Sequence, residues 1–469
     1  MPRQLIANPT LSSGKTANEQ ALESDAITDL SAIVSEEWRV QGNGEMSDRT
    51  DTAMLDRTSV PCTHEVSRRD MPLVEPKLVR HGTSILQRRV QRSGQLSLLD
   101  SELNDLSKNP YYTEQIITYI GNKRTLLPFI ARGLNVVRGR TSSGRLRTLD
   151  AFSGSGVVSR FLKSFSTTLT TCDLEEYAAI GNSCYLANQS EVDVGLVKQW
   201  IDRMNNAGEN DQITGIISEN YAPQDDNNIR IGERVFYTRR NARFIDTARA
   251  VVDDAPSSIR EHLLAPLLYM ASVHANTSGV FKGFYKNSET GIGQFGGNGK
   301  DALQRICRPI RVPYPIYSDT ECEYKIYLGD SNELAKSRQV FDVAYLDPPY
   351  NQHPYGSNYF MLNLIAKNKM PESTSAISGI PTEWNRSAYN KRQHAAKALR
   401  ELVFGLNARF LLISFNSEGF ISKEEMLSML SEVGKTDVLE TSYNTFRGSR
   451  NLAGRDIHVT EYLYLVEKE

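Results

Sequence analysis

The chain has 469 residues, enough for two or three domains, and a formal net charge of −2, which excludes a uniformly basic nucleic-acid coat but allows a local basic face. Its five cysteines form no CxxC pair, the first residues lack a secretory h-region, and no stretch reaches the roughly 20 apolar residues needed to span a bilayer. We therefore expect a cytoplasmic protein with reduced thiols that associates with no membrane.

Residues 1–107 are polar and only weakly periodic, so we expect a largely disordered extension. Short helices are possible within residues 26–38 and 84–103. An alternative for the second of these is a helix that packs on the core or touches DNA through Arg88, Arg89 and Arg92.

A different pattern begins near Tyr111. A helix is expected in "GNKRTLLPFIARGLNVV", then a strand, a glycine turn and a helix in "RTLDAFSGSGVVSRFLKSF", and a further strand and helix in "TLTTCDLEEYAAIGNSCYLAN". The alternation stops near residue 190 and resumes near 322 with the strands of "CEYKIYLGD", "FDVAYL" and "ARFLLISF". Strands alternating with helices predict a parallel sheet between helices.

The last two predicted strands, in residues 435–446 and 457–467, alternate apolar and polar residues and suit an antiparallel hairpin at the sheet edge. The predicted fold is therefore α/β, with a Rossmann-like sheet, helices on both faces and a C-terminal hairpin. We divide it into a cofactor-binding part at 108–189, an insertion at 190–322 and a second catalytic part at 323–469.

The segment "DAFSGSGVV" places Gly154 and Gly156 between a strand and a helix, where glycine allows a ligand to approach the backbone closely. Asp173 ends the next strand, 23 positions after Asp150, the spacing at which an acidic residue reaches ribose hydroxyls. Ser159 stands where a dinucleotide site would have a third glycine or an alanine, so a nucleoside without pyrophosphate is favoured. An ordinary tight turn between strand and helix is the alternative.

In "YLGDSNEL", Asp330 follows a predicted strand and could bind the exocyclic amine of an adenosine. It could equally cap the helix that follows it.

The segment "YLDPPYNQ" ends the strand "FDVAYL" at two prolines, which cannot donate to a sheet. Asp347 and the carbonyl of Pro348 could accept the two hydrogens of an aromatic amine and stabilise the positive charge that grows there during attack. Pro349 keeps the turn rigid, and Tyr350 could stack on the base, worth ~1–3 kcal/mol. A plain strand-ending turn is the alternative.

These motifs together resemble the S-adenosylmethionine-dependent amino-methyltransferases of DNA. "FSGSG" followed by "DPPY" with a long insertion between them is similar to the alpha group, the Dam-like adenine-N6 enzymes, many of which belong to restriction-modification systems. "YIGNKRTLLPFI" looks like the helix before that family's glycine loop. The resemblance covers about 111–190 and 322–469, and the long N-terminal extension departs from it.

The resemblance implies that S-adenosylmethionine is the cofactor and that no metal is needed. The residues expected on the cofactor side are Tyr119, Lys123, Asp150, Phe152, Gly154, Gly156, Asp173 and Asp330. The residues expected at the target base are Asp347, Pro348, Pro349 and Tyr350.

In such enzymes the insertion recognises the target, and here it carries clusters of basic residues among aromatic ones. The residues expected to bind DNA are Arg239, Arg240, Arg243, Lys282, Lys286, Arg305 and Arg308 in the insertion, with Arg447 and Arg450 in the loop of the late hairpin. A solvated surface helix or a plain hairpin loop is the alternative for each cluster.

The sequence as a whole therefore predicts a site-specific DNA adenine-N6 methyltransferase that binds double-stranded DNA and flips its target base. We expect a monomer, working alongside a cognate restriction endonuclease. The alternatives are an amino-methyltransferase of cytosine N4, RNA or a protein amide, and a catalytically inactive DNA-binding relative.

Overall fold

In the computed structural model, the residues described are 108–141, 144–297, 299–300, 302–444 and 458–469, all within the unit Ala53–Glu469. The N-terminal extension and the loop that carries Arg447 and Arg450 therefore lie outside the described residues. No helix in the described part is long and apolar enough to cross a membrane.

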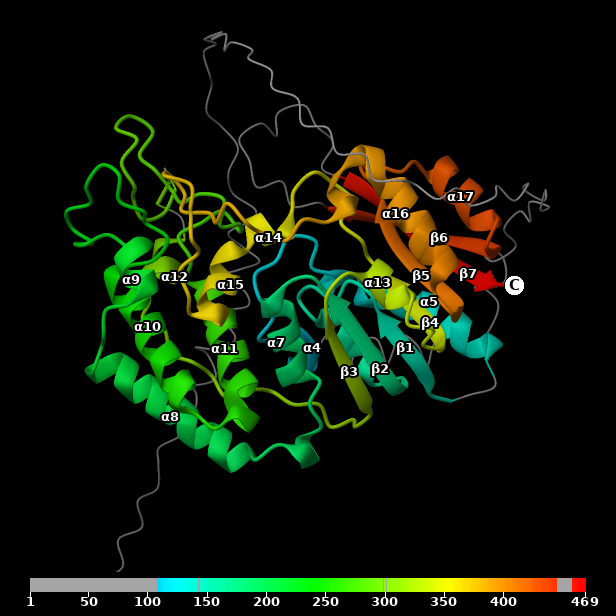
Figure 1. The fold of residues 1–469 in the computed structure, drawn as a ribbon, viewed down its shortest axis with the longest axis horizontal. Coiled ribbons are helices and arrows are strands. Elements are labelled where there is room, and N and C mark those ends of the chain that lie inside the picture. The colour runs from blue at the N-terminus through cyan, green and yellow to red at the C-terminus, as the bar shows by residue number, and fades with distance from the viewer. Residues whose placement is uncertain (1–107, 142–143, 298, 301, 445–457) are drawn as a thin grey trace, which may run out of the picture. The chain divides into compact units, whose positions relative to one another are not determined.

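The strands of the described chain form one mixed sheet in the order β3-β2-β1-β4-β5-β7-β6 (Figure 1). Their bounds are β1 (Leu146–Asp150), β2 (Ser166–Asp173), β3 (Glu323–Leu328), β4 (Phe341–Leu346), β5 (Ala408–Asn416), β6 (Gly434–Asn444) and β7 (His458–Lys468). Strands β1 to β5 are parallel, and β7 pairs antiparallel with both β5 and β6. The α/β fold and the C-terminal hairpin predicted from the sequence are confirmed.

The helices of the described chain surround this sheet and extend beyond one end of it. The α-helices are α4 (Pro110–Thr113), α5 (Leu127–Arg140), α6 (Val157–Lys163), α7 (Glu176–Tyr185), α8 (Val194–Asn210), α9 (Ile216–Asn220), α10 (Arg239–Asp254), α11 (Arg260–Val273), α12 (Leu303–Cys307), α13 (Ser331–Ala335), α14 (Tyr355–Asn358), α15 (Phe360–Lys367), α16 (Arg392–Gly405) and α17 (Lys423–Ser431). Short 3-10 turns are η2 (Arg124–Leu126), η3 (Gln189–Glu191), η4 (Ser257–Ile259) and η5 (Ala388–Asn390).

Helices cover both faces of the sheet, which explains the continuous apolar run of β5. On β5, Phe410 and Leu412 pack with α5 and α6, whereas Leu411 and Ile413 pack with α16 and α17 on the other face (Figure 1). A strand buried on both faces reads as a continuous apolar run, as "ARFLLISF" does.

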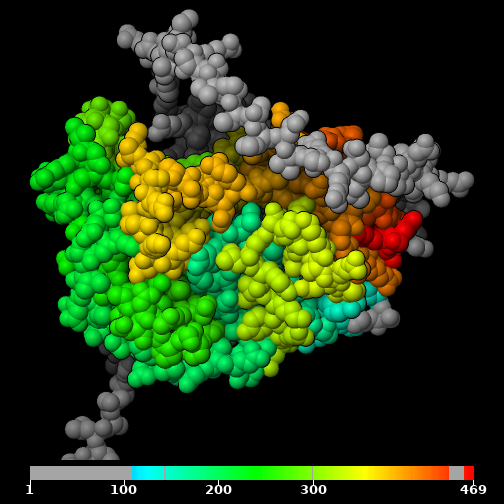
Figure 2. All heavy atoms as spheres, viewed as in Figure 1, coloured from blue at the N-terminus to red at the C-terminus, as the bar shows by residue number. Residues whose placement is uncertain are grey.

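The predicted insertion shares its core with the catalytic part. Residues of α8, α10 and α11 belong to the same buried cluster as residues of α7 and α15. The guanidinium of Arg249 on α10 donates to the carbonyls of Ile365 (2.9 Å) and Ala366 (3.1 Å) on α15. In Figure 2 the green surface of the insertion meets the yellow-orange surface of the segment around residues 355–385 without a break. The domain boundaries themselves stay a prediction.

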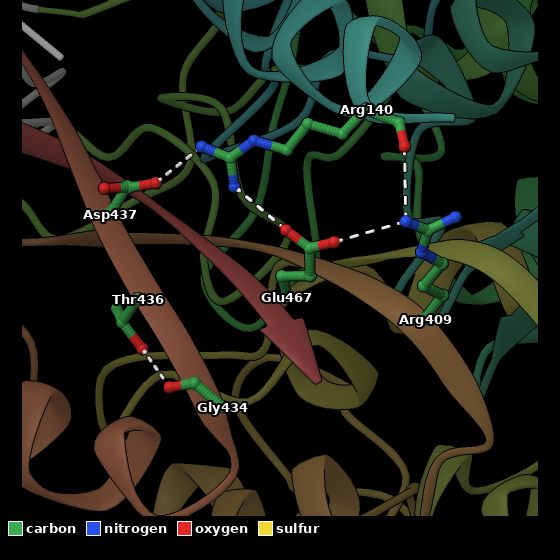
Figure 3. Close-up of polar contacts among 6 residues, drawn as sticks. All are labelled: Arg140, Arg409, Gly434, Thr436, Asp437 and Glu467. Carbon is green, nitrogen blue, oxygen red and sulfur yellow. Dashed lines mark hydrogen bonds and ion pairs between the residues drawn. The ribbon is translucent and has the colours of Figure 1, made fainter. Parts of the chain in front are cut away.

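The C-terminal hairpin is joined to the rest of the sheet by ion pairs at its open end (Figure 3). Arg140, the last residue of α5, binds Asp437 on β6 (2.8 Å) and Glu467 on β7 (3.4 Å). Glu467 also binds Arg409 on β5 (3.3 Å), whose guanidinium donates to the carbonyl of Arg140. These contacts tie the end of α5 to three strands.

Candidate active site

A pocket of about 840 Å³, counting its open mouth, lies at the carboxyl ends of β1, β2, β3 and β4. The strand order reverses between β1 and β4, because β2 and β3 extend to one side of β1 and β5 lies beyond β4. Crevices at such a reversal are where open α/β sheets bind their ligands. The topology therefore brings together residues as far apart in the sequence as Tyr119 and Asn390.

The glycine turn after β1 forms one wall of this pocket. Gly154 and Gly156 both have left-handed backbone angles, with φ of +47° and +76°. A Cβ on Gly154 would lie 3.1 Å from the ring of Tyr119, and the amide of Gly154 donates to Asp173 (2.7 Å). A side chain here would be strained and crowded, so the close approach of backbone and ring requires glycine.

Carboxylates from neighbouring strand ends surround the glycine turn. Burial raises the pKa of Asp150 to about 7 despite a hydrogen bond from Ser159 (2.6 Å), and raises that of Asp173 to about 6 despite backbone hydrogen bonds. Burial also raises the pKa of Glu175 to about 7. Asp330 lines the pocket while its side chain accepts from the amide of Asn332 (2.8 Å), so it is both a wall residue and a helix cap.

Aromatic rings also line the pocket, among them those of Tyr119 and Tyr355. Tyr119 stacks on Tyr355 (ring centroids 4.8 Å apart) and on Tyr359 (4.6 Å). Phe152 meets Tyr389 edge to face at 5.2 Å, and both line the pocket. The pocket thus combines flat apolar surfaces with carboxylates, a combination that suits a cationic nucleoside.

Asp347 lies at the end of β4 on the wall of the same pocket, with 18% of its side chain exposed. The ammonium of Lys123, itself buried, lies 3.2 Å from Asp347 and 2.9 Å from Glu461 on β7. Burial raises the pKa of Asp347 to about 6, and Lys123 opposes this rise while Glu461 adds to it. Lys123 is therefore an ion-pair partner of the carboxylate that begins the "DPPY" motif.

The rest of that motif forms the loop after β4. Pro349 lines the pocket and Pro348 is buried behind it. Tyr350 is half-buried, its ring meets Phe415 edge to face at 6.1 Å, and its carbonyl accepts from the amide of Phe420 (3.1 Å). The loop is thus held against the segment that follows β5.

Several pocket residues carry no signal in the sequence motifs. Asn385 comes from an irregular segment. Its side-chain amide donates to the carbonyl of Leu174 (2.6 Å) and to the carboxylate of Glu175 (3.3 Å), and these bonds hold the segment at the pocket. Glu175 also accepts from Asn363 on α15 (2.5 Å). Glu461, which is outside the pocket lining but pairs with Lys123, had a weak signal, because it falls on the apolar face of the strand "HVTEYLYLVE".

The basic residues predicted to bind DNA divide into two groups. Guanidinium groups of Arg239, Arg243 and Arg305 donate to main-chain carbonyls, those of Ser218, Gln212 and Ala275, respectively. The side chains of Arg240, Lys282, Lys286 and Arg308 are exposed. The DNA-binding role stays a prediction for all of them.

Within the described ranges, no three His, Cys, Asp or Glu side chains gather as a metal-binding group.

Comparison with known proteins gives a consistent set of relatives. A family model described as "D12 class N6 adenine-specific DNA methyltransferase" matches residues 119–429. Type II methyltransferase M.CviAII of Paramecium bursaria Chlorella virus 1 is 28% identical over 359 residues, which is 75% of this chain and 98% of the relative.

Type II methyltransferase M.NlaIII of Neisseria lactamica is 27% identical over 363 residues, covering 75% of this chain and 99% of the relative. Modification methylase StsI of Streptococcus sanguinis is 25% identical over 369 residues, or 75% of this chain and 52% of the relative.

Proposed function

Because the chain belongs to the D12 class of N6 adenine-specific DNA methyltransferases, we propose that its pocket holds S-adenosylmethionine beside a flipped adenine whose N6 amine faces Asp347. Enzymes of this family use S-adenosylmethionine as methyl donor. The observation that carries the proposal is that Asp347 lines the same pocket as the glycine turn and Asp173.

The residues of the pocket fit this cofactor. S-adenosylmethionine carries two positive charges, on its sulfonium and its ammonium, and supplies a methyl group that the sulfonium activates. Asp150, Asp173 and Glu175 offer carboxylates to a cation, and the stacked rings of Tyr119 and Tyr355 offer an apolar wall. Asp330 would accept from the adenosine amine at the mouth.

The chemistry at the target adenine is mainly electrostatic. The amine of adenine is a poor nucleophile because its lone pair is delocalised into the ring. Asp347 and the carbonyl of Pro348 would accept its two hydrogens, which favours a pyramidal nitrogen and stabilises the positive charge that grows on it. Tyr350 would stack on the base, and the proton that N6 loses after methylation would pass to Asp347 or to water.

The insertion, residues 190–322, would bind DNA next to the pocket mouth. The amide of Phe281 donates to the carbonyl of Asn358 on α14 (2.7 Å), so the loop that carries Lys282 lies against the helix that follows the "DPPY" motif. An exposed lysine at that place suits a phosphate beside the flipped nucleotide. The relatives named as type II enzymes support a role as the modification partner of a restriction endonuclease.

The test is an in-vitro assay with labelled methyl donor on double-stranded DNA and RNA, followed by separation of the nucleosides. We expect label in N6-methyldeoxyadenosine from DNA. Label in N4-methylcytosine or in RNA would establish one of the alternative substrates, and no transfer by protein that binds DNA would establish an inactive relative.

A further inference from the structure

Glu461 is a buried acidic residue near the start of β7, on the strand face that also carries Leu463 and Leu465. It lies beyond residue 429, where the match to the family model ends. Only 2% of the residue is exposed. A buried carboxylate is costly unless it is paired and hydrogen-bonded, so its presence on an apolar face calls for a physical reason.

Two partners satisfy this carboxylate. The ammonium of Lys123 lies 2.9 Å from Oε1, and the hydroxyl of Ser414 on β5 donates to the same oxygen over 2.9 Å. Lys123 in turn lies 3.2 Å from Asp347. One ammonium is therefore shared by two carboxylates, one in the pocket wall and the other behind it.

The sharing sets the charge at the reacting end of the pocket. If Lys123 faced Asp347 alone, its positive charge would neutralise the carboxylate that is needed to stabilise a growing positive charge on the substrate amine. With Glu461 present, the three groups together carry one net negative charge. Burial acts against the ammonium, but Asp347 and Glu461 outweigh it and hold the pKa of Lys123 well above its ordinary value.

We propose that Glu461 is a positioning residue for methyl transfer, which anchors Lys123 and shares its positive charge, so that a net negative charge remains beside the adenine amine. This inference rests on the proposed function of Asp347. It reassigns Lys123 from the cofactor to the support of the acidic residue. Ser414 completes the arrangement, because its hydroxyl fixes the Glu461 oxygen that Lys123 contacts.

The other titratable groups around Asp347 come from β1, β4, the loop after β4 and α14. Asp150 on β1 adds negative charge, and Tyr345 lies on β4, the strand that Asp347 follows. Tyr350 and Tyr355 contribute hydroxyl groups. Burial holds the pKa of the Tyr355 hydroxyl well above its ordinary value. A substitution of Lys123 or Glu461 by an uncharged residue changes the charge next to Asp347 most directly.

The test is the pH dependence of kcat/KM for Glu461→Gln, with the melting temperature and the dissociation constant of S-adenosylmethionine measured in parallel. The acid limb of kcat/KM reports the free enzyme's essential base, so the wild type should gain activity as pH rises through about 6. Removing the charge of Glu461 should move that limb to lower pH by about one unit and lower kcat about tenfold or more. Cofactor affinity should change less than about threefold.

Glu467→Gln is the matched control, because it makes the same exchange on the same strand at the ion pairs with Arg140 and Arg409 (Figure 3). Glu467→Gln should at most lower the melting temperature, and it should leave the acid limb of the pH profile of kcat/KM unchanged. An unshifted limb in folded Glu461→Gln would overturn the proposal.

If Glu461→Gln does not fold, the variant Ser414→Ala tests the proposal instead, since it keeps every charge and removes only the hydroxyl that donates to Glu461. A lowered kcat with cofactor affinity retained would support the positioning role, and an unchanged kcat would overturn it. Wild-type protein that does not methylate adenine would instead refute the proposed function, which keeps the two failures distinct.

Discussion

Four carboxylates of the pocket have pKa values well above those of isolated side chains. Asp150 and Glu175 have pKa values of about 7, and Asp173 and Asp347 of about 6, in each case chiefly because burial penalises the charged form. Several acids with raised pKa in one cleft are typical of a functional site. A bound cation would relieve the cost of their ionisation.

The gain in melting temperature on adding S-adenosylmethionine should therefore be larger at pH 8 than at pH 6. A carboxyl group whose folded pKa is raised stabilises the protein fully below its unfolded pKa, near 4, and that stabilisation is lost as pH rises through about 6 to 7. The cofactor-free protein thus carries unpaired negative charge at pH 8, which the cationic cofactor offsets. Thermal melts with and without cofactor at both pH values measure this. Equal gains would contradict a pocket that binds cations through these groups.

Whether a site residue could be predicted from the sequence depended on the type of strand, parallel or antiparallel, that places it at the pocket. Asp150, Asp173, Asp330 and Asp347 each follow a parallel strand, and parallel strands end at one edge of a sheet, so their common location follows from the pattern of strands and helices. Glu461 belongs to an antiparallel strand whose beginning reaches that edge only through hairpin pairing, such as Asn416 opposite Glu461. Pairing between distant strands cannot be deduced from local periodicity.

At the scale of the element, α10 illustrates how arginine-rich sequence can serve the fold. The hydroxyl of Thr238 accepts from the amide of Asn241 (3.2 Å) and so caps the helix. Arg249 is buried and bonded to main-chain carbonyls of α15, whereas Arg240 is exposed. The periodicity of a helix distinguishes such faces only when its packing partners are known.

Replacing each of these two arginines with alanine should affect a different property, stability for Arg249 and DNA binding for Arg240. Arg249→Ala should lower the unfolding free energy by about 2 kcal/mol or more, because the carbonyls of Ile365 and Ala366 lose a charged donor. Arg240→Ala should leave stability unchanged, weaken DNA binding, and reduce the slope of log affinity against log salt by about one, as expected for one lost phosphate contact. Denaturation and DNA titrations at several salt concentrations measure both. A normal salt slope in Arg240→Ala would show that DNA does not touch this end of α10.

At the scale of the whole molecule, the insertion and the catalytic part share one buried cluster through α7, α11 and α15. The alternation of strands and helices predicted a parallel sheet with a C-terminal antiparallel hairpin, but it did not predict the order of the strands. It did not predict the shared core, because α15 (Phe360–Lys367) follows the "DPPY" motif in the sequence yet packs on α7 (Glu176–Tyr185) and α11 (Arg260–Val273), which lie far before it. Such contacts depend on tertiary packing.

This shared core sets a condition for moving target recognition between enzymes. Replacing residues 190–322 with the corresponding segment of a relative should change the methylated sequence, because we expect that segment to bind DNA. The exchange should yield folded protein only if the transplanted helices match α7 and α15, since mismatched cores are destabilising. Methylation-sensitive sequencing of DNA from expressing cells identifies the site. A folded, active chimera that keeps the original site would place recognition outside the insertion.

The central claim is that one pocket holds the methyl donor and presents Asp347 to the substrate amine. The most direct measurement compares methyl transfer with S-adenosylmethionine binding in Asp347→Asn, using Asp342→Asn as control. Asp342 lies near the start of β4, the strand that Asp347 follows, but it pairs with Arg147 away from the pocket (2.7 Å). Asp347→Asn should lower transfer about a hundredfold or more with cofactor affinity within a few-fold of the wild type, and Asp342→Asn should change neither. Near-normal transfer by Asp347→Asn would contradict the account.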